Sequence, residues 1–224
     1  MKNIILVTCL LFSLPLGAVQ FERGGRRYTA ANTEFKYPVR CLKLTNTTLY
    51  QRSKREYKLF EKSYKKSTIK KYLKKVVFCK SLALDNVWSV RGTYNLNKKT
   101  LFIEVDYATN DTEYLLHHEF SSILLLSNHK LRDIRQKWIT NNVVYYKPLY
   151  HMTSGKSGYK GNFPLLRMKG FLYPYSRTNF ENDFNVMAAY YKADYLRRDL
   201  HKAAKNYSRI NNKFLLIKNF YNKF

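Results

Sequence analysis

The spacing of apolar residues changes twice along this chain, from helical to strand-like and back. Between about Tyr50 and Lys75, apolar residues recur at the three-to-four-residue intervals of an amphipathic helix. Residues 76–106 contain the run VVFCKSLAL and then TYNLNKKTLFIEVD, in which apolar and polar residues alternate around an NKK turn, as in two half-buried strands. Helical spacing returns in three later segments, 113–126, 179–206 and 210–221. This order predicts an α+β fold, in which a small mixed sheet is followed by an apolar helix and by C-terminal helices.

The first residues of the chain have the layout of a secretory signal peptide. Lys2 precedes a short apolar run that ends near the small residue Ala18, and the run is shorter than a membrane-spanning helix requires. We therefore expect residues 1–18 to be removed and the remaining chain to be secreted or periplasmic. Residues 19–40 are polar and basic, which predicts a flexible arm, and one folded domain is expected over 41–224.

Cys41 and Cys79 are the two cysteines outside the expected signal peptide. An oxidising compartment permits a disulfide between them. The alternative is two buried free thiols. The secretory signal favours the disulfide.

The chain is strongly basic, with 41 lysine and arginine residues, 15 acidic residues and a formal net charge of +26. A field of this size attracts anionic surfaces such as phospholipid or acidic glycan. The basic residues concentrate in segment 52–75, where Tyr57, Phe60 and Tyr64 lie at helical spacing. These aromatic residues are expected to form a buried stripe rather than a platform for stacking bases, so nucleic acid is a disfavoured partner.

The segment EYLLHHEFSSILLLSNH, residues 113–129, contains the start of a zinc-hydrolase motif. In H-E-x-x-H, two histidines four residues apart bind a metal ion from one helix face, and the glutamate activates a bound water. This chain has His118 and Glu119, but Ser122 stands at the second ligand position. His117 faces about 100° away from His118 on a helix, so the two are poorly placed to bind one ion. The alternative interpretation is an ordinary hydrogen-bonded His-Glu pair near the surface at a helix start.

A second segment, GFLYPYSRTNFENDFNVMAAYY, residues 170–191, carries a tyrosine, an Arg-Thr-Asn turn and two acidic residues at the start of a helix. Together with HEF at 118–120, it resembles the zincin metallopeptidases of the anthrax lethal factor type and related bacterial zinc-binding peptidases. In that family an H-E-F-x-H helix precedes a Y-x-R-T-N-like turn and a helix that opens with an acidic metal ligand. The resemblance covers roughly residue 76 to the C-terminus, and HEFSS is a degenerate form of the motif. The matching residues are His118, Glu119, Phe120, Tyr175, Arg177, Thr178, Asn179, Glu181, Asp183 and Phe184.

The resemblance implies a zincin-like fold, a zinc cofactor and specific roles. His118 would bind zinc, Glu119 would be the general base, and Tyr175 would donate a hydrogen bond to the oxyanion of the intermediate. The third ligand would be Glu181 or Asp183, although counting without gaps from the tyrosine falls between them. The strand TLFIEVD would form one wall of the substrate cleft. The gap-free position is Asn182, and further candidates for the missing ligand, or for accessory roles, are His117, Ser122, His129 and His151.

Two functions follow from these patterns. The first is a secreted zinc metallopeptidase with an altered ligand set, which hydrolyses a peptide or protein substrate. The second is a non-catalytic zincin-like pseudoenzyme that binds peptides or an anionic surface. Glu119 and Tyr175 favour activity because they would perform the chemistry, whereas Ser122 favours the pseudoenzyme because loss of one ligand removes most of the metal affinity. A basic adhesive or toxin-like protein unrelated to zincins is a third possibility.

Overall fold

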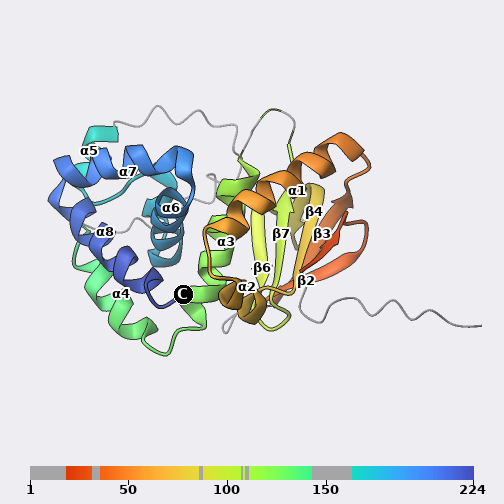
Figure 1. Ribbon diagram of the computed structural model, residues 1–224, viewed down its shortest axis with the longest axis horizontal. Coiled ribbons are helices and arrows are strands. Elements are labelled where there is room, and N and C mark those ends of the chain that lie inside the picture. The colour runs from red at the N-terminus through yellow and green to blue at the C-terminus, as the bar shows by residue number, and fades with distance from the viewer. Residues whose placement is uncertain (1–18, 32–35, 86–87, 107, 109–110, 143–162) are drawn as a thin grey trace, which may run out of the picture.

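The computed structural model describes residues 19–31, 36–85, 88–106, 108, 111–142 and 163–224. The expected signal peptide and His151 lie outside these residues. A curved mixed sheet forms one side of the molecule, the C-terminal helices form the other, and helix α3 (Thr112–Leu126) runs between them (Figure 1). The fold is α+β, as the apolar spacing predicted. Within the described ranges, no helix has the length and apolar character needed to cross a membrane.

The sheet closes on itself. Strand β4 pairs in parallel with β7 along its first half and antiparallel with β3 along its second, β3 pairs with β2, and β7 pairs with β6. A parallel bridge between Ala31 and Asn95 joins β2 to β6, and the Asn95 side chain donates a hydrogen bond of 2.7 Å to the Thr29 carbonyl. The ring therefore runs β4–β3–β2–β6–β7 and back to β4. The strands are β1 (Gln20–Glu22), β2 (Arg27–Ala31), β3 (Lys36–Lys43), β4 (Lys75–Leu84), β5 (Trp88–Ser89), β6 (Gly92–Asn95) and β7 (Thr100–Glu104).

The face enclosed by this ring is apolar and contains a disulfide. Cys41 on β3 and Cys79 on β4 are joined, which is the bridge that the sequence favoured. Both cysteines are buried in a cluster with side chains from β2, β3, β4 and β7, among them Ala30, Val39 and Phe102. The bridge thus links neighbouring strands inside the small core of the sheet.

The described residues 19–31 and 36–40 are not a flexible arm, and the folded domain does not begin at residue 41. This part of the chain forms β1, β2 and the first half of β3, and Ala30 and Val39 are buried. β1 lies in parallel beside β4, where Lys75 donates a hydrogen bond of 2.6 Å to Glu22. The prediction was wrong because the side chains of these strands that face away from the core are largely basic. Only a few apolar side chains face the core, and most of them are small.

Two basic helices lie between β3 and β4 in the chain, where the sequence predicted a single helix. α1 (Thr47–Lys62) and α2 (Lys66–Tyr72) are separated by a short turn. The predicted apolar stripe is buried, with Tyr57 and Phe60 on α1 and Tyr64 in the turn between the helices. The lysine and arginine side chains on the opposite face are mostly exposed.

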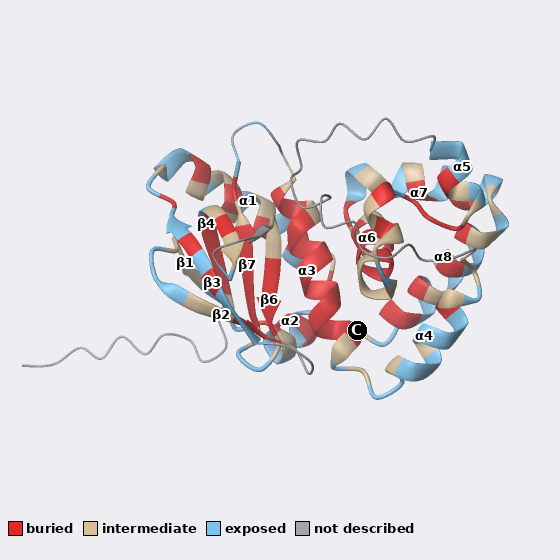
Figure 2. Cartoon of the chain, turned by 180° about the vertical axis from the view of Figure 1, so that it is seen from behind, coloured by how far each residue is buried: buried red, intermediate tan, exposed pale blue. Residues whose placement is uncertain are grey.

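The C-terminal half contains more helices than its apolar spacing predicted. The expected helix 179–206 divides into α6 (Phe180–Lys192) and α7 (Asp194–Asn206), because Ala193 has an extended backbone between them. α8 (Ser208–Tyr221) was predicted, whereas α4 (Leu131–Ile139), α5 (Phe163–Met168) and the short 3-10 helix η1 (Pro174–Arg177) were not. α3 is buried on nearly all sides because it lies between the sheet and α6 (Figure 2).

Candidate functional site

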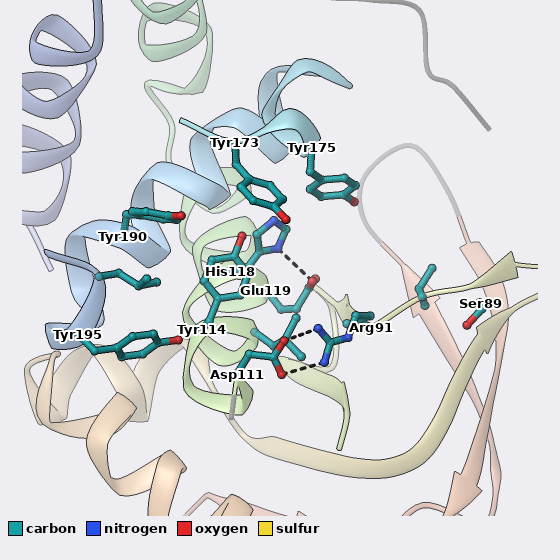
Figure 3. Close-up of a pocket in the computed structure, with 14 residues that line it drawn as sticks. Ser89, Arg91, Asp111, Tyr114, His118, Glu119, Tyr173, Tyr175, Tyr190 and Tyr195 are labelled. Carbon is teal, nitrogen blue, oxygen red and sulfur yellow. Dashed lines mark hydrogen bonds and ion pairs between the residues drawn. The ribbon is translucent and has the colours of Figure 1, made fainter. Parts of the chain in front are cut away.

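A pocket of about 410 Å³ lies beside α3, at the junction of the sheet and the C-terminal helices. Its walls come from the chain around β5 and β6, from α3, from the turn around η1, and from α6 and α7 (Figure 3). The lining residues are Ser89, Val90, Arg91, Gly92, Asp111, Tyr114, Leu115, His118, Glu119, Tyr173, Tyr175, Tyr190, Tyr195 and Leu196. His118 and Glu119 on α3 therefore face the same cavity as Tyr175, which is distant from them in the sequence.

His118 and Glu119 form a buried pair in the middle of α3. The His118 Nδ1 and Glu119 Oε1 atoms are 3.1 Å apart, within hydrogen-bond distance. Only 6% of His118 and 7% of Glu119 are exposed, so the pair is not the surface pair of the alternative interpretation. Among the described residues, His118 Nε2 has no hydrogen-bond partner.

Gly92 on β6 creates the space that Glu119 occupies. A Cβ atom at this position would lie 2.6 Å from Glu119 Oε1, closer than real contacts allow. The wall nearest the His-Glu pair is thus formed by β6 and the residues before it. The strand TLFIEVD was expected to be this wall, but its residues form β7, which is paired on both sides by β4 and β6.

Ser122, at the second ligand position, belongs to a buried hydrogen-bond network. Its Oγ accepts a hydrogen bond of 2.7 Å from Asn185 Nδ2. The Tyr94 hydroxyl donates to Glu181 Oε1 at 2.8 Å. Burial raises the pKa of Glu181, and the nearby hydroxyls of Ser122 and Tyr94 oppose that shift only in part.

Tyr175 lies next to His118, with ring centroids 5.9 Å apart. Burial, followed by the negative charges of Glu119 and Glu181, raises the pKa of Tyr175, so its hydroxyl stays protonated at neutral pH. Asn182, at the gap-free third-ligand position, donates a hydrogen bond of 2.7 Å from its side chain to Thr178 Oγ1.

Asp183 and His117 do not line the pocket, which corrects two predictions. Asp183 accepts hydrogen bonds from Lys213 Nζ at 2.6 Å and from Trp138 Nε1 at 2.8 Å, in a buried cluster of its own. His117 lies about 100° around α3 from its neighbour, where its Nδ1 is 3.1 Å from the Tyr64 hydroxyl. His129 is exposed beyond the end of α3 and is not a lining residue either.

The residues of this site do not fit a three-ligand zinc centre. Zinc sites in proteins are built from at least three His, Cys, Asp or Glu side chains around one point. In the part of the chain that the structure describes, no such group of three exists. Of the two ligands that the resemblance implied on α3 and α6, His118 lines the pocket, whereas the Glu181 carboxylate already accepts a hydrogen bond from Tyr94.

Four pocket tyrosines were not singled out in the sequence. Tyr114 could have been found, because it lies four residues before His118 and so on the same helix face; their ring centroids are 5.8 Å apart. Tyr173 is two residues before Tyr175, whereas Tyr190 and Tyr195 carry no local signal. Comparison of the chain with protein-family models, with curated proteins and with solved structures found no match.

Proposed function

We propose that this protein is a secreted, non-catalytic domain of zincin-like architecture that binds a peptide in its pocket without a metal ion. The arrangement of elements supports the zincin-like assignment. A helix carrying His118-Glu119 packs against the sheet, β6 borders the pocket, and a tyrosine turn leads into α6 beside that helix.

One observation carries the proposal that the domain binds rather than cleaves. The side chains at two positions where a zincin-like peptidase would hold its metal ion are already hydrogen-bonded within the protein: Ser122 accepts from Asn185, and Glu181 accepts from Tyr94. Satisfied buried networks of this kind stabilise one arrangement of side chains. The cavity in front of the network remains about 410 Å³ in volume, which is large enough for one or two amino-acid side chains.

A metal-dependent peptidase is the second candidate, favoured by His118 Nε2. This atom is buried and has no hydrogen-bond partner within the described ranges, as expected of a nitrogen that awaits a ligand. The hydrogen bonds of Ser122 and Glu181 would have to break before those groups could contribute to a metal site. The second candidate therefore requires a rearrangement that the first does not.

Retention of peptides on the immobilised protein tests the proposal. A random hexapeptide library is passed over the wild type and over two variants. Ser89→Trp places an indole at the exposed mouth of the pocket, and Ser67→Trp is a matched control on the exposed face of α2. We expect the wild type and the control to retain peptides, with and without a chelator, and Ser89→Trp to lose most of that retention. Mass spectrometry should find the peptides intact. Chelator-sensitive cleavage would establish the second candidate, and the absence of both retention and cleavage would overturn both.

A further inference from the structure

The pocket differs in charge from the rest of this basic protein. Of the chain's 41 lysine and arginine residues, the pocket lining contains Arg91 alone. Asp111 neutralises it in a two-pronged ion pair, in which Arg91 Nη2 and Asp111 Oδ1 are 2.8 Å apart. Within the described part of the chain, no lysine or arginine forms an ion pair with Glu119. Glu119 thus leaves a net negative charge in the lining.

Further carboxylates surround the tyrosines at the mouth of the pocket. After burial, the charges of Glu113, Asp111 and Glu56 raise the pKa of Tyr195, and Asp199 contributes to raising that of Tyr190. Asp111, Glu56 and Asp199 are each ion-paired with an arginine, so the unpaired negative charge in the lining is that of Glu119. Screening in physiological salt weakens the effect of exposed lysines and arginines that lie more than about 8 Å away.

Five of the fourteen residues that line the pocket are tyrosines. Tyr114, Tyr173, Tyr175, Tyr190 and Tyr195 converge from four elements around His118 (Figure 3). Burial raises the pKa of Tyr114 well above its ordinary value and that of Tyr190 to about 12. The rings of Tyr114, Tyr175, Tyr190 and Tyr195 are therefore neutral phenols at physiological pH. The electron-rich face of a tyrosine ring attracts a cation by roughly 0.5 to 2 kcal/mol per contact.

His118 supplies a hydrogen-bond acceptor in the same cavity. Its Nδ1 lies 3.1 Å from Glu119 Oε1, and a carboxylate oxygen accepts hydrogen bonds, so the proton of a neutral imidazole is placed on Nδ1. Nε2 is then an acceptor, and it is buried with no partner among the described residues. A ligand group that satisfies both Nε2 and Glu119 must be a donor. Ammonium and guanidinium groups are donors only.

We infer that the pocket binds the side chain of a lysine or an arginine of the peptide ligand, with its charged head beside Glu119 and His118 Nε2 and its stem between the tyrosine rings. This inference rests on the proposed peptide-binding function and names the chemistry of the ligand. An acidic side chain is excluded by Glu119, and a neutral apolar one leaves Nε2 without a donor.

Peptide sets with one fixed central residue test the inference. Hexapeptide mixtures carry lysine, arginine, norleucine, citrulline or glutamate at one position and random residues elsewhere, and their retention on the full-length protein is measured. We expect the lysine or arginine set to be retained at least about tenfold more than its uncharged counterpart, norleucine or citrulline, a difference of about 1.4 kcal/mol. Equal retention of charged and uncharged sets would overturn the inference and leave peptide binding intact.

Two substitutions locate the effect. Glu119→Gln keeps the size of the side chain and removes its charge, so we expect the preference for a cation to fall about tenfold. Asp133→Asn removes one negative charge from an exposed position on α4 and should leave the preference unchanged. Thermal unfolding of both variants monitors folding.

If no peptide set is retained, the proposed function fails, and free cations decide the inference separately. n-Butylammonium and n-butylguanidinium are titrated against n-butanol, with tyrosine fluorescence as the readout. A saturable response to the cations that Glu119→Gln abolishes would support the inference. Identical responses to cations and alcohol would overturn it.

Discussion

Removing the Cys41–Cys79 disulfide should lower the free energy of unfolding by about 4 kcal/mol. The two residues are separated by 38 positions in the chain, and the loop-closure relation for a cross-link of that length gives this value. Both cysteines are buried in the core enclosed by the sheet, so Cys→Ala substitutions add a smaller cost for lost packing. Because small domains are stable by only about 5–15 kcal/mol, the loss is a large share of the total.

Equilibrium unfolding in guanidinium chloride measures this effect, with the fluorescence of the buried Trp138 as the signal. Cys41→Ala, Cys79→Ala and the double variant should be destabilised by similar amounts, because either substitution alone breaks the cross-link. The dependence of unfolding free energy on denaturant should steepen, since the unlinked chain exposes more surface when unfolded. A double variant that loses less than about 1 kcal/mol, or single effects that simply add, would refute the loop-closure argument.

Four further predictions concern other parts of the molecule. Lys213→Met leaves the Asp183 carboxylate buried without its cation and should cost about 3–5 kcal/mol in chemical unfolding, and an unchanged midpoint would contradict the ion pair. Gly92→Ala places a Cβ 2.6 Å from Glu119 Oε1, so it should reduce the retention of cationic peptides about as much as removing the charge of Glu119 does, while retention at the wild-type level would count against the geometry. Burial lowers the pKa of Lys192 from 10.5 to about 8. Between these two pH values the unfolded chain binds more protons than the folded chain. The free energy of unfolding should therefore rise from pH 8 to pH 10.5 by on the order of 2–3 kcal/mol. A Lys192→Met variant, compared with the wild type by urea titration at each pH, should lack that contribution. Vesicles with anionic phospholipid should bind the protein at about 0.1 M salt and release it near 1 M, because the Debye length falls from about 10 to 3 Å, and salt-insensitive binding in a sedimentation assay would exclude an electrostatic origin.

The fold was predictable where apolar residues outnumber polar ones on one side of an element. The hairpin of β6 and β7, the helix α3 and the buried stripe of α1 were all visible in the sequence for this reason. β1, β2 and β3 were not, because their inward positions are small residues such as Ala30 and their outward positions are basic. Closure of the sheet depends on the pairing of Ala31 with Asn95, which are 64 positions apart, and no local pattern reports such a contact.

The site was predictable only in its central helix and tyrosine turn. The motif resemblance selected His118, Glu119 and Tyr175, which line one pocket. It could not show that Asp183 is held elsewhere by Lys213, a partner 30 residues away. Nor could it show that Ser122 bonds Asn185, because that contact depends on how α6 crosses α3.

The zinc content of the purified protein tests the central claim most directly. Wild type and His118→Ala are incubated with zinc, freed of unbound ions by gel filtration, and measured by inductively coupled plasma mass spectrometry. If Ser122 and Glu181 are committed to their hydrogen bonds, both proteins should carry far less than one zinc ion per chain. One zinc ion per wild-type chain, lost on substitution of His118, would contradict a metal-independent binding site.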